Sequence, residues 1–155
     1  DQVRKAALFC IKSINFWTAY FLIGTPGETE KDIYKTLDFM YEIKPDFASI
    51  GVYEPFPGTA MFEEGIRRGL VKADMAIEEF YGTLPNDYYK APGRRQVDTI
   101  DQARFTVLES EIKAKFHVYN KGVGRLFKRV KSRTRLYRNQ PTSLLTDFRK
   151  FLSWS

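Results

Sequence analysis

The hydrophobic residues in the first 70 positions follow two alternating patterns, helical spacing and continuous apolar runs. Apolar side chains recur every three or four residues over residues 3–14, which predicts a helix with one buried face. Residues 16–23 are almost entirely apolar, as in a strand covered on both faces. Helical spacing returns over residues 33–41, after Thr29 and Asp32, which are spaced like a weak capping box. Helix, strand and helix in this order predict a parallel α/β arrangement.

A second strand-like run covers residues 47–53, and helical spacing follows it. Each strand-like run ends near a Pro-Gly pair, Pro26-Gly27 or Pro57-Gly58, which suits a type II turn because glycine accepts positive φ. The two glycines lie 31 positions apart, the length of one strand-helix-strand unit. Ligands of such sheets bind at the carboxyl ends of strands, beside free helix N–H groups. The turns are therefore candidates for a ligand site, and ordinary turn chemistry is the alternative interpretation.

The segments YFLIGTPGETEKDIYKTLDF (residues 20–39) and PDFASIGVYEPFPGTAMFEEG (residues 45–65) resemble the second half of a radical S-adenosylmethionine (SAM) barrel. The resemblance covers about residues 1–70. It implies the second half of a partial (βα)6, TIM-like barrel, followed by an α-helical carboxyl-terminal extension. It also implies SAM and a [4Fe–4S] cluster, which together generate a 5′-deoxyadenosyl radical that abstracts hydrogen from the substrate. The cofactors carry this chemistry, and the protein binds and orients them.

The stretch KFHVYNKGVGRLFKRVKSRTRLYR (residues 115–138) is similar to the helical extension of radical SAM enzymes that carry an amino-terminal cobalamin-binding domain. The anaerobic magnesium-protoporphyrin IX monomethyl ester cyclases and the hopanoid methylases belong to that group. This resemblance implies oxidative cyclisation or methylation of an unreactive carbon. The implied substrate is a small molecule such as a tetrapyrrole or a lipid, and cobalamin is an additional cofactor expected in the full-length protein.

The same resemblance implies which residues bind SAM. In the family, the strand end corresponding to LIGTPGE lies against the adenine side of SAM, and the next strand end lies near the same ligand. The implied cofactor-binding residues are Leu22, Gly24, Gly27, Glu28, Tyr53, Glu54 and Pro57. Glu28 also has a purely structural interpretation, because the helix dipole favours an acid at a helix amino terminus. Glu54 is therefore the better polar candidate.

Cys10 is the only cysteine, so the Cys-x-x-x-Cys-x-x-Cys triplet that holds the family's cluster is absent from this sequence. We therefore expect the chain to be inactive alone, without catalytic residues or metal ligands of its own. We expect residue 1 to be an internal position of a longer enzyme whose amino-terminal half carries the triplet. The two strands predicted here would pair with that half along an open sheet edge. His117, the only histidine, has no other metal-ligating cluster near it and is expected to be structural.

Charge is distributed unequally along the chain. Residues 1–100 carry 12 Lys and Arg against 15 Asp and Glu, whereas residues 101–155 carry 13 against 4. Such an asymmetry indicates two functional regions, or a structured unit followed by a basic extension. The sequence predicts a barrel part over residues 1–70, a loop or linker over residues 71–97 and a basic helical extension over residues 98–155.

The extension is expected to begin with a helix capped by Asp98 or Thr99. Its apolar stripe consists of Phe105, Leu108, Ile112, Phe116 and Tyr119. Further on, residues 125–138 mix Arg and Lys with apolar and aromatic side chains. This segment has three interpretations, ranked in this order: a solvated helix face, a peripheral contact with an anionic membrane, and a nucleic-acid-binding tail. The alternative function is accordingly a non-catalytic α/β module with a basic binding tail.

The composition bears on localisation. No apolar run approaches the roughly 20 residues of a membrane span, and the single cysteine excludes an intrachain disulfide. We therefore expect a cytoplasmic protein, with the inner membrane face as a candidate site of peripheral contact. Nucleic acid is the least favoured partner, because no recognised RNA-binding motif accompanies the basic segment.

Overall fold

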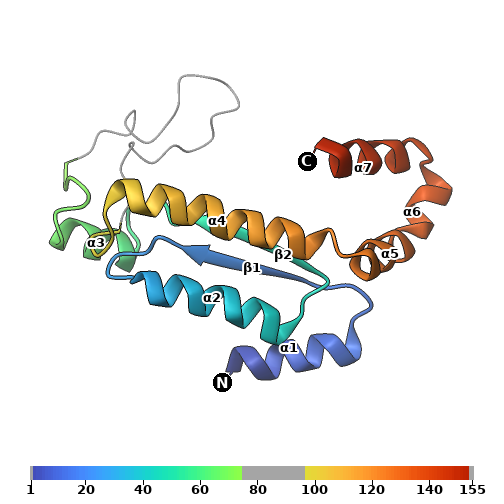
Figure 1. Ribbon diagram of the computed structural model, residues 1–155, viewed down its shortest axis with the longest axis horizontal. Helices are drawn as coiled ribbons and strands as arrows, with labels where there is room; N and C mark the ends of the chain where they lie inside the picture. Colours follow the sequence, from blue (N-terminus) through green and yellow to red (C-terminus); the bar gives the residue numbers. More distant parts are fainter. Residues whose placement is uncertain (1, 75–96, 154–155) are drawn as a thin grey trace. The chain divides into compact units, whose positions relative to one another are not determined.

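The computed structural model describes residues 2–74 and 97–153, and helices dominate it (Figure 1). In chain order the elements are α1 (Gln2–Ser13), β1 (Thr18–Ile23), α2 (Glu30–Ile43), β2 (Phe47–Val52), α3 (Ala60–Arg67), α4 (Gln102–Asn120), α5 (Val123–Ser132), α6 (Thr134–Asn139) and α7 (Thr142–Ser153). The strands β1 and β2 pair in a small parallel sheet. The prediction of an α/β fold with parallel strands is confirmed. The partial barrel stays a prediction, because two strands are too few to show one.

The predicted local signals are present in the structure. Gly27 and Gly58 both adopt positive φ, +80° and +81°, as the Pro-Gly turns require. The Thr29 hydroxyl accepts a hydrogen bond from the Asp32 N–H, and the Asp32 carboxylate accepts one from the Thr29 N–H in return. Thr59 caps α3 by accepting from the Phe62 N–H. The turns and caps that start the helices after each strand are therefore encoded locally.

The chain divides into two compact units, each discontinuous in sequence. The first comprises Asp1–Tyr20, Phe39–Ser49 and Lys113–Ser155, and the second comprises Phe21–Asp38 and Ile50–Ile112. Most of the predicted linker, residues 75–96, lies outside the described residues. The domain boundaries drawn from the sequence stay a prediction.

The second unit has an apolar core with polar contacts around it. Its buried apolar side chains include Ile23, Ile33, Leu37, Phe105, Leu108 and Ile112. The Tyr34 hydroxyl donates to the Glu111 carboxylate at 3.1 Å, and Arg104 forms an ion pair with Glu30. These contacts join α2 to the first part of α4 within this unit. A smaller cluster around Phe62 covers the inner side of α3.

In the first unit, the end of α4 is joined to the start of β2. The Asn120 side chain donates to the Ala48 carbonyl at 2.7 Å and accepts from the Ala48 N–H at 2.9 Å, as a neighbouring strand would. The Tyr119 hydroxyl donates to the Pro45 carbonyl at 2.7 Å. Tyr41 packs edge-on against Tyr119, with ring centroids 5.6 Å apart. The buried stripe predicted for α4 is confirmed, since all five of its side chains are buried.

Large apolar side chains remain exposed on the amino-terminal elements. On α1, Leu8 and Phe9 are exposed and Ala7 is the buried side chain; on β1, Tyr20 and Leu22 are exposed. Within the described ranges β1 pairs with β2 alone, so its other edge is open. The expectation that further strands pair with this edge stays a prediction. No helix among the described residues is long and apolar enough to pass through a bilayer.

Candidate functional site

An open groove lies where β1 and β2 end and α3 begins, within the second unit. Its volume is about 390 Å³, in the range of small-molecule sites. It is lined by Leu22, Val52, Tyr53, Glu54, Phe56, Thr59, Ala60 and Met61. Most of these side chains are apolar, and the polar groups come from the short segment between β2 and α3. The groove therefore combines an apolar wall with a few polar atoms, as binding sites for small molecules do.

The apolar wall of the groove follows from the ends of the strands. Leu22 is the penultimate residue of β1 and is exposed, while its neighbour Ile23 is completely buried. Gly51 on β2 carries no side chain, and an added Cβ would lie 3.8 Å from the Leu22 Cδ1 atom. The strand pleat therefore turns Leu22 away from the core and toward the groove.

Tyr53 extends the pairing of the two strands by one residue, since its N–H donates to the Ile23 carbonyl at 2.7 Å. Its side chain is buried, and among the described residues its hydroxyl has no hydrogen-bond partner. Burial raises the pKa of the Tyr53 phenol, and the nearby Thr59 side chain opposes this shift in part. A buried hydroxyl without a partner costs about 1–3 kcal/mol, and because this hydroxyl is enclosed by protein, a ligand reaches it only when the groove opens.

The structure brings three of the seven predicted residues together in the groove. Leu22, Tyr53 and Glu54 all line it, and Glu54 is half-buried there. Pro57 is exposed in the turn that precedes α3 and is not part of the lining. Phe56 and Met61 also line the groove, although the sequence did not single them out as ligand-binding. The sequence signal that could have identified them is their position close to the predicted turn at Pro57.

Glu28 folds back onto its own turn. One of its carboxylate oxygens, Oε2, accepts from the Gly24 N–H at 2.5 Å and from the Thr25 N–H at 3.1 Å. Burial raises the pKa of Glu28, and these two backbone hydrogen bonds oppose the shift. The carboxylate thus stabilises the turn that ends β1. Its predicted role in binding SAM stays a prediction beside this structural one.

Gly24 and Gly27 are required by packing within the chain. Gly24 has a φ of +85°, and an added Cβ would lie 2.9 Å from Phe105 Cζ and 3.1 Å from Val52 Cγ1. Gly27 has its N–H bonded to the Asp98 carboxylate at 2.7 Å, and an added Cβ would lie 3.0 Å from the Arg68 guanidinium. Both glycines are therefore in close contact with the chain's own side chains.

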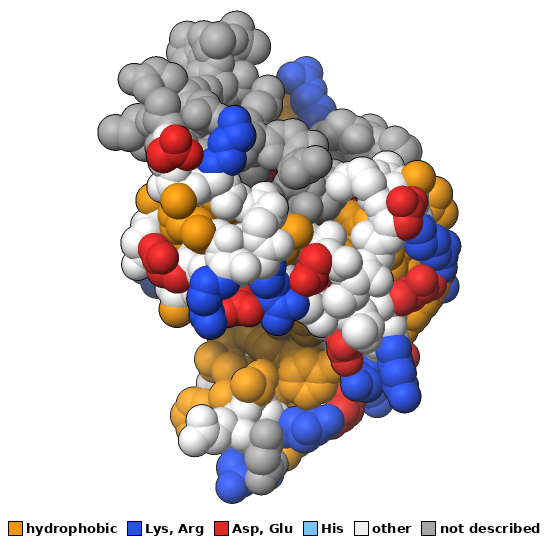
Figure 2. Space-filling view, turned by 90° about the vertical axis from the view of Figure 1, so that its left-hand side faces the viewer, with side chains coloured by type: hydrophobic (Ala, Val, Ile, Leu, Met, Phe, Trp, Pro, Cys, Tyr) orange, Lys and Arg blue, Asp and Glu red, His pale blue; other side chains and the backbone are white. Residues whose placement is uncertain are grey.

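The Asp98 carboxylate belongs to a charged cluster that the sequence did not reveal. Arg68 lies between Glu64 and Asp98, at N–O distances of 2.6 Å and 2.8 Å. The Arg68 hydrogen bond holds the pKa of Asp98 below its usual value. Acidic and basic side chains lie next to one another on the face shown in Figure 2. This cluster fixes the Gly27 turn to the end of α3.

The described residues contain no group of three or more His, Cys, Asp and Glu side chains placed to hold a metal ion. Cys10 is a free, partly exposed cysteine on α1. A [4Fe–4S] cluster held by three thiolates therefore does not fit the residues of this chain. An adenine-like group fits the groove better, because the apolar wall of Leu22, Val52 and Met61 offers a surface for a flat ring.

Short stretches of the chain are similar to parts of longer proteins. It is 30% identical over 71 residues to an uncharacterized methyltransferase of Pyrococcus horikoshii, a match that covers 46% of this chain and 15% of that protein. It is 49% identical over 43 residues to the ribosomal protein uS12 methylthiotransferase RimO of Pelotomaculum thermopropionicum, a match that covers 28% of this chain and 10% of that protein. It is 46% identical over 39 residues to the tRNA-2-methylthio-N(6)-dimethylallyladenosine synthase of Ralstonia pickettii, and this match covers 25% of this chain and 9% of that protein.

These matches are local, and each spans 15% or less of the relative's length. No family model and no solved structure matches the chain. The methylthiotransferase matches support a link to the radical SAM superfamily. They do not point to the cyclases and hopanoid methylases that the basic extension resembles.

Proposed function

We propose that this chain forms the carboxyl-terminal part of the barrel of a radical SAM enzyme, and that its groove contributes to the SAM site. The observation that carries the proposal is the convergence of Leu22, Tyr53 and Glu54, three residues that the motif resemblance names, on one groove at the strand ends. Parallel sheets bind ligands at this end of their strands. The local matches to methylthiotransferases support the link to the radical SAM superfamily on which the proposal rests.

The groove residues have complementary roles in this proposal. Leu22, Val52 and Met61 form the apolar surface against which the adenine ring packs and from which water is excluded. Glu54 offers a carboxylate that accepts hydrogen bonds from hydroxyl or amino groups, and Tyr53 contributes to the lining beside it. Glu28 and Gly24 act indirectly, because their hydrogen bond fixes the end of β1 from which Leu22 projects.

The chemistry of the complete enzyme needs residues outside this chain. Bound SAM and a [4Fe–4S] cluster supply the radical that activates an unreactive carbon. The cluster ligands belong, in this proposal, to an amino-terminal half that pairs with the open edge of β1. The relatives named above favour transfer of a methyl or methylthio group over oxidative cyclisation. A cobalamin-binding domain in the complete protein is the further proposal that the basic extension motivates.

The test is a titration of this chain with adenosine and with SAM, followed by nuclear magnetic resonance of its methyl groups. The methyl signals of Leu22, Val52 and Met61 should shift and saturate, while those of Leu145 on α7 should stay in place. A Leu22→Ala variant should weaken binding, and Leu145→Ala, another exposed leucine, should not. The proposal is wrong if groove methyls do not respond at millimolar ligand, or if all methyls respond equally.

A further inference from the structure

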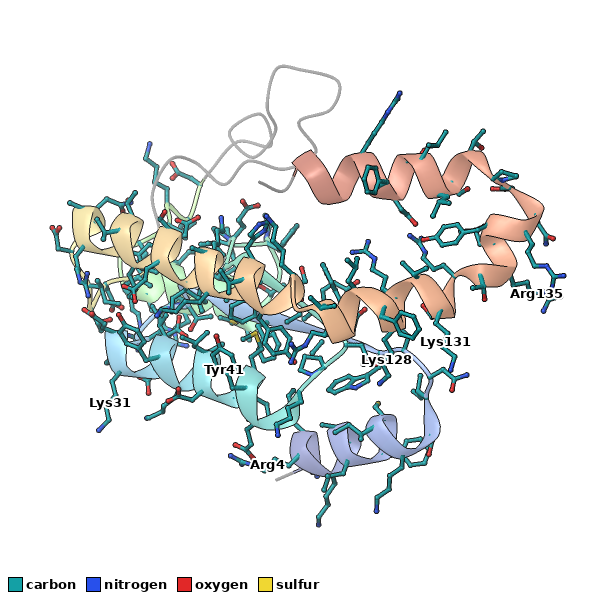
Figure 3. All side chains as sticks on the ribbon, turned by 45° about the vertical axis from the view of Figure 1, so that its right-hand side comes forward. Arg4, Lys31, Tyr41, Lys128, Lys131 and Arg135 are labelled. Carbon is teal, nitrogen blue, oxygen red and sulfur yellow. The ribbon has the colours of Figure 1, made fainter. Side chains whose placement is uncertain are left out.

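Helix α5 packs against the first unit with its basic side. The Arg125 guanidinium lies 3.5 Å from the centre of the Tyr119 ring, and Lys128 pairs with the buried Asp46 at 2.7 Å. Arg129 lies over the Phe47 ring at 5.3 Å. These three basic residues occupy one side of α5, and each has a partner on another part of the unit. Figure 3 labels Lys128 on this helix.

The apolar side of α5 faces solvent as a result. Val123, Phe127 and Val130 follow the i, i+4, i+7 spacing of one helix face, and their exposed fractions are 83%, 70% and 40%. An ordinary surface helix has the reverse arrangement, with its apolar stripe toward the core. A contiguous exposed apolar surface of this kind marks a site of interaction.

The apolar surface continues onto α7. Leu126 and Val130 of α5 face Leu144 and Phe148 of α7 across a groove of about 150 Å³. Asp147 on α7 forms an ion pair with Arg133, at the junction of α5 and α6, and accepts a hydrogen bond from Tyr137 of α6 at 2.8 Å, so that α7 is fixed to α6. Leu145 and Phe148 are largely exposed beside the groove. The helices α5 and α7 thus present one apolar face, held by an internal polar contact.

The segment that carries this face is rich in cations. Residues 121–146 contain eight Lys and Arg and no Asp or Glu. Of these, Lys131, Arg135 and Arg138 are exposed, and Figure 3 shows the Arg135 side chain extending from α6 away from α5 and α7. An apolar helix face bordered by Lys and Arg is the composition of helices that lie in the interface of an anionic bilayer.

We propose that the face formed by α5, α6 and α7 docks on an anionic membrane surface. Val123, Phe127 and Phe148 enter the boundary between head groups and acyl chains, and Lys131, Arg135 and Arg138 contact lipid phosphates. Nucleic acid fits less well, because outward aliphatic side chains such as Val123 neither neutralise phosphates nor stack on bases. A second copy also fits less well, because two strongly basic faces repel each other.

The test is sedimentation of this chain with vesicles of phosphatidylcholine alone or mixed with phosphatidylglycerol. The chain should bind the anionic vesicles, and added salt should weaken the binding. Phe127→Gln and Val123→Gln should each weaken it, Phe127→Gln by about tenfold or more. Val118→Gln is the matched control, since Val118 on α4 is as exposed as Phe127, at 70%, but lies outside the docking face. It should bind like the unchanged chain.

Four results would overturn the proposal. The first is that the chain stays in solution beside anionic vesicles at low salt, and the second is that Phe127→Gln and Val123→Gln bind as well as Val118→Gln. The third is that a single-stranded RNA binds more tightly than the vesicles and loses affinity only when Lys131, Arg135 and Arg138 are replaced by Gln, which would identify a nucleic-acid surface. Size-exclusion chromatography of the same variants completes the test, because a dimer that Phe127→Gln dissociates would identify a second copy as the occupant.

Discussion

The Asp98 carboxylate accepts a hydrogen bond from the backbone N–H of Gly27 at 2.7 Å, although 71 positions separate the two residues. The same carboxylate forms an ion pair with Arg68, and the hydroxyl of the adjacent Thr99 donates to the Glu28 carbonyl. The segment before α4 is thereby fixed to the turn that ends β1. This turn orients the groove residue Leu22, so the stability of the contact bears directly on the proposed site.

Replacing Asp98 should therefore destabilise the chain. Asp98→Ala removes the acceptor for Gly27 and the partner of Arg68, and we expect a loss of about 1–2 kcal/mol in the free energy of unfolding, because the pair is partly exposed. Asp98→Asn keeps an acceptor oxygen and should lose less. Urea denaturation measures both. Asp38→Asn, at an exposed carboxylate on α2, is the control. If Asp98→Ala is as stable as the unchanged chain, the contacts of Asp98 do not stabilise the fold.

The same contact predicts a dependence on pH. The pKa of Asp98 is lowered in the folded chain, chiefly by Arg68, so the carboxylate favours folding at pH values above its unfolded pKa of about 3.9. This contribution should disappear as the pH falls through the folded pKa. The difference in unfolding free energy between the unchanged chain and Asp98→Asn should thus be constant near neutral pH and shrink below about pH 4. A difference that grows on acidification would contradict this assignment.

Two glycine substitutions separate backbone strain from packing. Gly24 and Gly58 have nearly the same φ, but an added Cβ at Gly24 meets Phe105 and Val52, whereas one at Gly58 meets no atom within 4 Å. Gly58→Ala should cost about 1–2 kcal/mol from the left-handed conformation alone. Gly24→Ala should cost about 2–4 kcal/mol, because overpacking is added. Thermal unfolding of both variants measures the difference, and equal losses would exclude the close packing of Phe105.

Asn120 should contribute more to stability than its partly exposed position suggests. Its side chain makes two hydrogen bonds to the backbone of Ala48, which is buried. Asn120→Ala leaves the Ala48 N–H and carbonyl without these partners, and we expect a loss of about 2 kcal/mol. Asn139→Ala, at an exposed residue on α6, is the matched control and should change stability little. Amide hydrogen exchange at Ala48 provides a local measurement, since its protection should fall in Asn120→Ala alone.

Local signals in the sequence were sufficient for much of the fold. The positive φ of Gly27 and Gly58 and the Thr29–Asp32 cap depend on neighbours within a few positions, and all were predicted. The predicted cap of α4 was wrong. Asp98 and Thr99 bond to the distant turn. Asp101, three residues further on, instead accepts from the Ala103 N–H, and α4 begins at Gln102. Periodicity cannot show such a competition between a local cap and a distant partner.

The meeting of three predicted residues in one groove follows from the order of the elements, while their role in binding SAM stays a prediction. Leu22, Tyr53 and Glu54 meet because strand ends meet, which the order of elements already implies. The inward orientation of Glu28 was not evident, because it depends on two N–H groups that only the folded turn presents. The outward apolar face of α5 was likewise hidden. Its pattern is that of an ordinary amphipathic helix, and only the contacts of Arg125 and Lys128 show which side faces the protein.

Tyr53 gives the sharpest test of the groove. Its buried hydroxyl has no partner among the described residues, so Tyr53→Phe should leave the free energy of unfolding unchanged or raise it by up to about 1 kcal/mol. Tyr119→Phe is the matched control, because the Tyr119 hydroxyl donates to the Pro45 carbonyl and its loss should cost about 1 kcal/mol. If the Tyr53 hydroxyl binds adenosine, Tyr53→Phe should weaken that binding by about threefold to tenfold, while Tyr119→Phe leaves it unchanged. Destabilisation by Tyr53→Phe would instead show that the hydroxyl is already hydrogen-bonded in solution, and would remove it from the proposed site.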